Sequence, residues 1–324
     1  MLSVEWNKLD IKSCIYNASG PRCTTSTDLD KLNVSKSGMV LTKSTTLEYR
    51  EGNPKPRYWD DDNGSINSMG LPNNGIDYYL DFIEGKYNTK PYFISVSGLS
   101  LEENISILGK IFHHNDTKIS GKVDGIEINL SCPNIVGKGQ LAYDFNELDV
   151  FLTKIFEFLA TWNSRKNILI GFKLPPYFDI EQFNQVSDIL IKYDIDFITC
   201  VNSIGNGLII DWKNESTVIK PKEGLGGIGG VFIKPTGLAN VNMFYKLFKK
   251  KNSNIKVIGC GGIQTGIDAF EYILCGAHMV QIGTQYQRED VGVFDRIEKE
   301  LKEIMKNKKY KKLIDFRGKL KVTN

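Results

Sequence analysis

The sequence predicts an α/β protein of the (β/α)8 class, the TIM barrel. Eight short runs of apolar and β-branched residues recur along the 324-residue chain, and amphipathic helical patterns lie between most of them. Buried strands that alternate with amphipathic helices indicate a parallel sheet. Eight such units in a chain of this length indicate a closed barrel, with a doubly wound open sheet as the alternative.

The predicted strands are mostly continuous apolar runs, as expected for strands that are buried on both faces. Typical examples are "YFISVS", "GIEINL" and "NILIGFK". In chain order the eight strands are expected near residues 13–17, 38–43, 92–97, 125–130, 167–173, 197–202, 256–260 and 279–283.

Start and stop signals place the helices between these strands. Ser100 with Glu103 predicts a capping box, and an apolar stripe from Leu148 to Leu159 predicts the next helix. Asp179 precedes a third apolar stripe, and Pro235 suits the first position of a fourth helix.

The last two helices are predicted near the end of the chain. Thr265 can cap a helix that Gly276 would end, and a lysine-rich stretch at about 291–307 has the pattern of a final helix. No repeat or linker divides the chain, so residues 1–324 are expected to form a single domain.

Two connections are too long to be plain turns. Residues 44–75 and 203–234 each follow the carboxyl end of a predicted strand. Loops of this length in a compact domain are usually functional or disordered, and barrel active sites lie at the carboxyl ends of the strands. We therefore expect long loops at the mouth of the barrel.

Composition and charge exclude several classes of protein. The formal net charge is +3, but residues 302–321 contain nine basic and two acidic residues, which leaves −4 on the remainder. A mildly acidic body argues against nucleic acid as a partner, and the basic segment is expected to be a solvated helix face. No apolar run is long enough to span a membrane, and no signal peptide is apparent, so we expect a cytoplasmic protein.

The six cysteines and three histidines have no spacing typical of a metal site. We therefore predict no bound metal. Without an export signal, the cysteines are expected to be thiols in a reducing compartment.

Polar and small residues gather at the predicted strand ends, which meet at one mouth in a barrel. Each residue alone is a weak signal, and the interpretation rests on their convergence. They are Lys43, Asn129, Cys132, Lys173, Asn202, Ser203, Gly259, Gly261, Gly262, Gly283 and Thr284.

The glycines after the seventh and eighth strands, in "GCGGI" and "IGT", predict a phosphate site. Backbone N–H groups and a helix N-terminus can hold a phosphate dianion there, as is common in this fold. The alternative is that these glycines only form tight turns.

Lys43 and Lys173 each close a strand. Such a lysine can pair with a carboxylate, form a Schiff base, or place a fixed positive charge beside a cofactor ring. Four amides can donate and accept hydrogen bonds, which suits a flat ring with imide and carboxylate groups, although turn formation is the alternative: Asn67, Asn129, Asn134 and Asn202.

Cys132 lies in "EINLSCPN" (127–134), between Asn129 and Asn134. A thiol with a pKa of about 8.5 is only about 3% ionised at pH 7, yet it can accept a proton from a substrate oriented against it. The alternative is a small buried hydrophobic residue. Its place at the start of a loop favours a catalytic role, whereas Cys14, Cys200 and Cys260 lie in or beside apolar strands and are expected in the core.

These motifs resemble the dihydroorotate dehydrogenases, and specifically their soluble class 1A type. The resemblance extends from about residue 17 to 316. It is carried by "NASG" (17–20), "TKSTT" (42–46), "GNPKPR" (52–57), "SINSMGLPN" (65–73), "EINLSCPN" (127–134), "FKLPPYFD" (172–179), "TCVNSIGNGL" (199–208), "IKPKEGLGGIGG" (219–230), "GCGGI" (259–263) and "VQIGT" (280–284).

The resemblance implies an FMN-dependent enzyme that oxidises (S)-dihydroorotate to orotate in de novo pyrimidine (UMP) biosynthesis. It makes Cys132 the general base that removes the C5 proton while a hydride passes from C6 to flavin N5. Class 2 enzymes have serine at this position and an N-terminal helical extension, whereas here the first strand is expected near residue 13.

The resemblance also implies the residues that bind substrate and cofactor. The substrate-binding residues would be Lys43, Asn67, Met69, Gly70, Leu71, Asn129, Asn134, Asn202 and Ser203. The flavin contacts would be Ala18, Ser19, Gly20, Lys43, Ser44, Asn129, Lys173, Val201, Gly229, Gly230, Cys260, Gly261, Gly262, Gly283 and Thr284.

Class 1A membership implies a homodimer that passes electrons to fumarate, giving succinate, without the iron–sulfur partner subunit of class 1B. Two small departures from the family pattern are Ser19, where a small apolar residue is expected, and a longer segment at 160–167. Other functions remain as alternatives: a Schiff-base lyase that uses Lys173, or a non-catalytic protein that binds flavin or phosphate.

Overall fold

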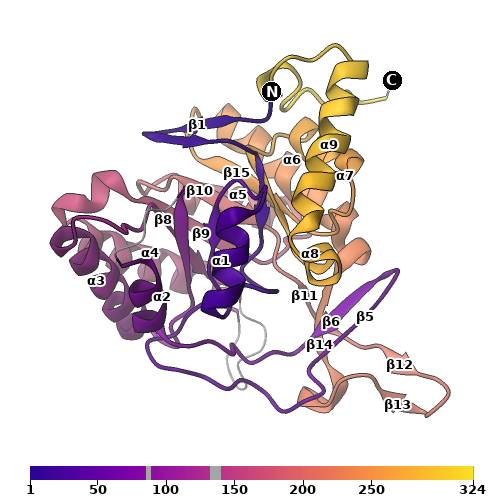
Figure 1. Ribbon diagram of the computed structural model, residues 1–324, viewed down its shortest axis with the longest axis horizontal. Coiled ribbons are helices and arrows are strands. Elements are labelled where there is room, and N and C mark those ends of the chain that lie inside the picture. Colours follow the sequence, from indigo (N-terminus) through magenta and orange to yellow (C-terminus); the bar gives the residue numbers. More distant parts are fainter. Residues whose placement is uncertain (85–88, 132–139, 324) are drawn as a thin grey trace.

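The computed structural model describes residues 1–84, 89–131 and 140–323. Eight parallel strands form its main sheet, and neighbours in the sheet follow one another along the chain (Figure 1). This order confirms the predicted barrel and excludes the doubly wound alternative, in which the strand order reverses. The strands are β3 (Ile15–Asn17), β4 (Val40–Leu41), β7 (Tyr92–Val96), β8 (Gly125–Asn129), β9 (Leu169–Leu174), β10 (Phe197–Cys200), β15 (Lys256–Cys260) and β16 (Met279–Ile282).

A side chain joins the first and second barrel strands, where no backbone ladder is formed. The Asn17 Nδ2 donates to the Leu41 carbonyl oxygen at 2.7 Å, and the Leu41 N–H donates to the Asn17 Oδ1 at 3.0 Å. The Gly38 N–H also donates to the Ile15 carbonyl oxygen at 2.7 Å. The buried amide of Asn17 therefore replaces the missing strand pairing and completes the ring.

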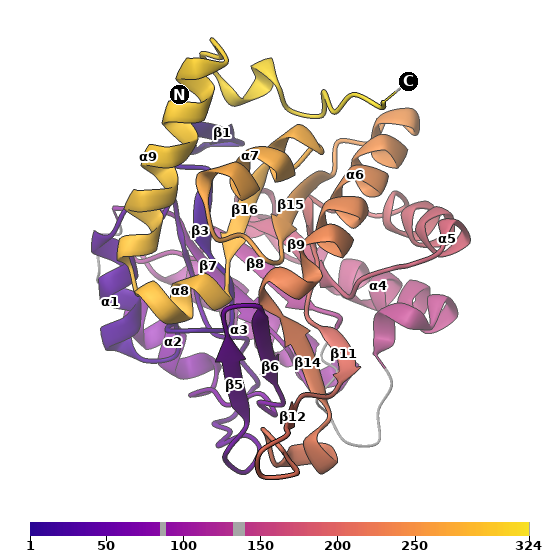
Figure 2. The ribbon, with the colours of Figure 1, turned by 90° about the vertical axis from the view of Figure 1, so that its right-hand side faces the viewer.

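Helices cover the outside of the barrel (Figure 2). Their apolar residues pack on the strands, and the largest are buried in one continuous core. The helices are α1 (Ser26–Val34), α2 (Ile76–Ile83), α3 (Leu101–Thr117), α4 (Phe145–Leu159), α5 (Ile180–Leu190), α6 (Lys234–Lys250), α7 (Gly266–Leu274), α8 (Thr284–Glu289) and α9 (Gly292–Asn307). Short 3₁₀ turns lie at Leu141–Tyr143, Asn163–Asn167, Pro221–Gly224, Gly230–Ile233 and Leu313–Asp315.

The helix signals were mostly correct, with two differences. Ser100 caps α3 as predicted, but Glu103 does not complete a capping box, because its carboxylate accepts from the Leu47 and Leu99 N–H groups instead. That carboxylate ties the loop after β4 to α3. Pro235 is the second residue of α6, not the first, while Thr265 forms a full capping box at α7.

The two long connections fold together at the mouth. They form an antiparallel sheet in the order β11 (Ile204–Gly207), β14 (Gly226–Gly229), β6 (Gly64–Asn67) and β5 (Tyr58–Asp61). Beyond it lies a hairpin of β12 (Ile210–Asp211) and β13 (Ser216–Thr217). Figure 2 shows the β5, β6, β11 and β14 strands at one end of the barrel. We call this four-stranded sheet the mouth sheet.

A hairpin of β1 (Val4–Trp6) and β2 (Leu9–Ile11) covers the opposite end (Figure 1). Trp6 is 4% exposed, and its ring meets those of Phe197 and His278 edge-on, with centroids 5.3 and 5.2 Å away. Both partners lie at the amino ends of barrel strands. Burial lowers the pKa of His278 to about 3, helped by the charges of Arg317 and Lys256.

Candidate active site

A cavity of about 420 Å³ opens at the carboxyl ends of the barrel strands. This volume lies in the usual range for small-molecule and cofactor sites. Its walls come from the barrel, the mouth sheet and the loops that follow β3, β4, β15 and β16. It is the place where the sequence predicts the functional residues to converge.

Glycines form one end of the cavity. Gly262 has a φ of +66°, and a Cβ there would lie 2.7 Å from the Gly230 carbonyl oxygen, so only glycine fits. A Cβ at Gly20 would meet no atom within 4 Å, and one at Gly283 would meet only Ala18, at 3.8 Å. These two lining glycines therefore leave space that is open to a ligand.

A chain of buried polar groups holds Lys173 at the floor. Its Nζ donates to the Gln281 Oε1 at 2.6 Å, and the Gln281 Nε2 donates to the Glu127 Oε2 at 2.6 Å. Burial favours the neutral amine, but the interactions of Lys173 with Cys260 and Glu127 outweigh it, so the pKa of Lys173 is raised. The floor of the cavity therefore carries a fixed cation.

Lys43 and the serines around it form a second polar wall. The Lys43 Nζ donates to the Gly20 carbonyl oxygen at 3.2 Å. Ser44 hydrogen-bonds to Ser95 at 2.9 Å and to Ser19 at 3.3 Å, between hydroxyl oxygens. Ser19, which departs from the expected family pattern, is thus joined to Ser44, and both line the cavity.

Three amide side chains also line the cavity, each held by hydrogen bonds. The Asn129 Oδ1 accepts from the Ser131 N–H at 3.1 Å, and the Asn202 Nδ2 donates to the Ser131 Oγ at 2.9 Å. The Asn67 Nδ2 donates to the Gly227 carbonyl oxygen at 3.2 Å, across the mouth sheet. These contacts fix the rotamers of three amides that line the cavity.

Every predicted flavin contact lines this cavity: Ala18, Ser19, Gly20, Lys43, Ser44, Asn129, Lys173, Val201, Gly229, Gly230, Cys260, Gly261, Gly262, Gly283 and Thr284. Of the other predicted substrate residues, Asn67, Met69, Leu71, Asn202 and Ser203 line it. Gly70 is not among the lining residues. It has a φ of +71° and allows the turn between Met69 and Leu71. Cys132 and Asn134 lie outside the described residues.

Several lining residues were not predicted. Tyr58 and Ser65 come from the mouth sheet, and burial beside Asp60 raises the pKa of Tyr58 to about 12. Their positions in "RYWDDDNGSIN" gave only a loop signal, because their pairing depends on a sheet formed with distant residues. The others are Pro21, Arg22, Thr24, Ile233, Ile263, Gln264, Gln285 and Gln287.

Within the described ranges, no group of three or more His, Cys, Asp or Glu side chains could hold a metal ion. In the same ranges, none of the helices is long and apolar enough to cross a bilayer. The five cysteines that are described are free and buried.

The barrel, the glycine-lined end, the buried cation and the converging amides define a class of enzyme. It is a (β/α)8 barrel whose site suits a flat, hydrogen-bonding ring together with an anionic group. The sequence model of the family described as "Dihydroorotate dehydrogenase" matches residues 1–305. The chain belongs to the dihydroorotate dehydrogenase family.

Curated relatives cover almost the whole chain. "Putative dihydroorotate dehydrogenase A (fumarate)" of Streptococcus agalactiae serotype Ia is 52% identical over 322 residues, 98% of both chains. "Dihydroorotate dehydrogenase A (fumarate)" of Lactococcus lactis subsp. lactis is 50% identical and covers 99% of both. "Dihydroorotate dehydrogenase (fumarate)" of Kluyveromyces lactis is 49% identical, with 99% of this chain and 98% of the relative covered. These relatives confirm the predicted class 1A type.

A solved structure supports the fold independently. The crystal structure of DHODH in complex with ferulenol from Eimeria tenella has a TM-score of 0.79 and covers 98% of this chain and 88% of its own. At 20% identity this similarity concerns the fold alone.

Proposed function

We propose that this enzyme oxidises (S)-dihydroorotate to orotate in de novo pyrimidine biosynthesis with FMN as its cofactor and fumarate as its electron acceptor, which leaves as succinate. Membership of the dihydroorotate dehydrogenase family supports the reaction, and the names of the curated relatives support the acceptor. The observation that carries the proposal is that the fifteen residues expected to contact FMN line one cavity.

The cavity fits FMN in two chemical respects. Gly261, Gly262 and Gly283 line one end without side chains, so their backbone groups can approach a phosphate closely. At the floor, Lys173 provides positive charge of the kind that stabilises an anionic reduced ring. When bound, FMN would supply the two-electron acceptor that the oxidation needs.

The substrate would be held by amides from three elements. Asn129 ends β8, Asn202 follows β10, and Asn67 ends β6 of the mouth sheet. Their fixed donors and acceptors match the ring amides of a pyrimidine, and the charge of Lys43 complements its carboxylate. Asn134 is proposed as a further amide of this group.

Cys132 is the proposed general base for the C5 proton. A thiol of ordinary pKa works as a base when the substrate is oriented against it, so positioning matters more than a strongly shifted pKa. The base and the hydride acceptor should lie on opposite faces of the flat substrate, since the proton and the hydride leave adjacent carbons.

Two further properties follow from the family resemblance. We infer a homodimer that works without an iron–sulfur partner subunit, and a cytoplasmic location. The measured mass in solution tests the first inference: a monomer, or a requirement for a second polypeptide, would contradict it.

An anaerobic spectrum tests the proposed reaction. The purified protein should show a flavin absorbance band that bleaches with dihydroorotate and recovers with fumarate. Acid extraction should release FMN, identified by its mass. Bleaching without recovery would reject fumarate as acceptor. Bound flavin that dihydroorotate leaves oxidised would indicate a non-catalytic binding protein.

The Schiff-base alternative gives a different result. A lyase that uses Lys173 would be colourless and would be trapped by borohydride in the presence of its substrate. The surroundings of Lys173 oppose this alternative, because a Schiff-base lysine needs a lowered pKa and here the pKa is raised.

A further inference from the structure

Arg296 lies on α9, outside the barrel wall, behind the two loops that line the glycine end of the cavity. We propose that Arg296 is a positioning residue for the cofactor phosphate, because it ties the loop after β15 to the helix after β16 and so fixes the two sides of the phosphate site relative to each other. This inference rests on the proposed use of FMN.

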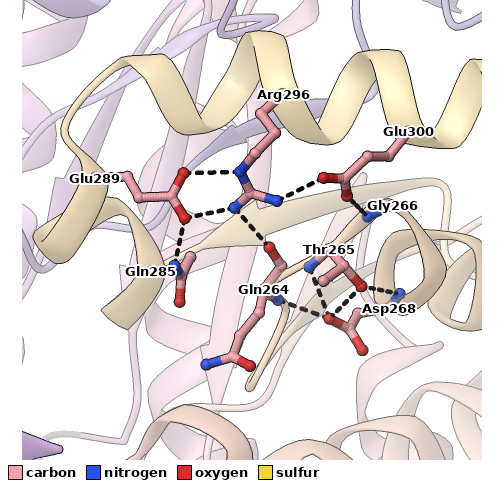
Figure 3. A network of polar contacts seen from close by, with 8 residues as sticks. All are labelled: Gln264, Thr265, Gly266, Asp268, Gln285, Glu289, Arg296 and Glu300. Carbon is pink, nitrogen blue, oxygen red and sulfur yellow. Dashed lines mark hydrogen bonds and ion pairs between the residues drawn. The ribbon is translucent and has the colours of Figure 1, made fainter. Parts of the chain in front are cut away.

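The guanidinium of Arg296 makes four hydrogen bonds (Figure 3). Its Nε donates to the Glu289 Oε2 at 2.8 Å, and its Nη2 donates to the Glu289 Oε1 at 2.5 Å. The Nη1 donates to the Glu300 Oε1 at 2.8 Å, and the Nη2 also donates to the Gln264 carbonyl oxygen at 2.9 Å. One planar group therefore joins α8, α9 and the loop after β15.

The loop after β15 is held from both sides. Arg296 binds the carbonyl of Gln264, while the Asp268 Oδ2 accepts from the N–H groups of Gln264 and Thr265 at 2.8 and 2.7 Å. The Glu300 Oε2 accepts from the Gly266 N–H at 2.6 Å. Gln264 itself lines the cavity, two residues after Gly262. The position of this side of the phosphate site is thus set partly from α9.

The other side of the phosphate site is carried by α8. Its first and second residues, Thr284 and Gln285, line the cavity, and its last residue, Glu289, is the bidentate partner of Arg296. The Gln285 Nε2 also donates to Glu289. Because α8 is only six residues long, holding Glu289 restrains the whole helix, including its lining residues.

The positive charge of Arg296 supports the same role as its hydrogen bonds. Burial favours protonation of Glu289, but hydrogen bonds from Arg296 and Gln285 outweigh it and lower its pKa. Arg296 therefore neutralises carboxylates that lie behind a site for a dianion. Lysine could keep the charge, but it could not hold a carboxylate in two places and a carbonyl at once.

A simpler interpretation is that Arg296 only strengthens the packing of α9. The two interpretations differ in what they predict for flavins with and without a phosphate. Loss of positioning would weaken binding of FMN but not of riboflavin, which lacks the phosphate. Loss of packing alone would lower thermal stability and affect both flavins equally.

The test is a fluorescence titration of full-length protein, stripped of flavin, with FMN and with riboflavin. For Arg296→Lys we expect about tenfold weaker FMN binding, as for loss of one strong charge-assisted hydrogen bond, and a riboflavin Kd within about twofold of wild type. Lys299→Met is the control, since Lys299 is exposed on the same helix and pairs only with Asp295 in the described contacts. It should change neither Kd.

If Arg296→Lys does not fold, a second variant tests the same inference. Glu289→Gln removes a negative charge near the phosphate site but also breaks the bidentate contact. Positioning predicts weaker FMN binding, whereas a purely electrostatic effect predicts tighter binding.

Unchanged FMN binding in both variants would overturn the inference, and so would equal losses for FMN and riboflavin or tighter FMN binding by Glu289→Gln. Wild-type protein that binds no FMN would instead reject the proposed cofactor, so the two failures are distinguishable.

Discussion

At the residue scale, the buried chain from Lys173 through Gln281 to Glu127 is the most constrained part of the site. Gln281 is completely buried and links a cation to a carboxylate through opposite ends of one amide. Thr199 donates to the same Glu127 oxygen at 2.7 Å. Since an unpaired buried charge is costly, each member of the chain holds the next in place.

Gln281→Met should therefore destabilise the protein, because it leaves Lys173 and Glu127 without their shared partner. We expect a loss of about 1–3 kcal/mol in the free energy of unfolding, measured by urea titration. Tyr16→Phe is the matched comparison, since it removes only the 3.1 Å contact between the Gln281 Nε2 and the Tyr16 hydroxyl. A loss no larger than that of Tyr16→Phe would show that the link to Lys173 contributes little.

Replacing Cys132 tests its proposed role as base. Cys132→Ala should keep bound FMN but slow flavin reduction by dihydroorotate by about 10²–10⁴-fold, the usual contribution of general base catalysis. Cys132→Ser should regain activity as the pH rises, since a hydroxyl is a weaker acid than a thiol. Stopped-flow absorbance measures both. Near wild-type reduction by Cys132→Ala, or full activity of Cys132→Ser at pH 7, would remove the thiol from the mechanism.

Many cavity residues could be predicted because they lie directly at strand ends, where the chain order of a barrel makes them converge. Arg296 could not, because two of its partners come from other elements, α8 and the loop after β15, and its own position in "FDRIEKE" shows only an amphipathic helix. Gly70, by contrast, was predicted to bind substrate, but it forms the bend between the lining residues Met69 and Leu71 and is not itself among the lining residues.

At the element scale, α8 connects the glycine end of the cavity to the mouth sheet. The Arg288 Nε donates to the Asp60 Oδ2 at 2.7 Å, and its Nη2 donates to the Asp61 carbonyl oxygen. Ser65 of β6 and Thr284 of α8 share a hydrogen bond of 3.0 Å between their hydroxyls. The element that presents Thr284 to the cavity therefore also holds the sheet that presents Asn67.

Arg288→Met should raise the KM for dihydroorotate, because it loosens the mouth sheet that presents Asn67. The ion pair is partly exposed, so we expect about 1 kcal/mol or less, which is at most about a fivefold change. Steady-state kinetics measure it, with Lys154→Met as a surface control on α4. A fall in kcat at unchanged KM would mean that Arg288 does not act through substrate binding.

The barrel strands were predictable, whereas the mouth sheet was not. Barrel strands such as "YFISVS" have an apolar pattern that predicts a strand. The β14 segment reads "GGIG", which has no such pattern, and it forms a strand only by pairing with β6, about 160 residues earlier. Glu103 likewise does not complete the expected capping box, because its carboxylate accepts from the Leu47 N–H of the loop after β4 as well as from the nearby Leu99 N–H. In both cases contacts between distant segments overrode a local pattern.

At the scale of the whole molecule, chemistry and stability are separated along the barrel axis. The mouth sheet lies at one end of the barrel and the β1–β2 hairpin covers the other (Figure 1), and the cavity is at the end of the mouth sheet. Substitutions at the end covered by the hairpin should therefore change stability without changing catalysis.

His278 makes the stability of the folded protein depend on pH. Its pKa is about 3 in the folded protein and about 6.5 when unfolded, so the unfolded chain binds more protons between these values. The contribution of neutral His278 to stability is complete above about pH 6.5 and is lost as the pH falls toward 3.

His278→Phe should make unfolding less sensitive to acid over this window, with kcat at pH 7.5 unchanged. Thermal melts of both proteins from pH 7 to pH 4 provide the measurement, and the difference between them isolates His278 from carboxyl groups such as Asp124, whose pKa burial raises to about 6. Parallel melting curves for the two proteins would exclude His278 as a source of acid sensitivity.

The position of the cavity, at the end of the barrel opposite the β1–β2 hairpin, also has a kinetic consequence. Trp6 packs on Phe197 and His278 at the amino ends of the strands, while the cavity lies at the carboxyl ends, so we expect reductant and oxidant to use this same cavity. If only one of the two can occupy the cavity at a time, they must react with the enzyme in turn. Initial rates should then give parallel double-reciprocal lines as one partner is varied at several levels of the other, and orotate should compete with fumarate. Converging lines would mean that both are accommodated together.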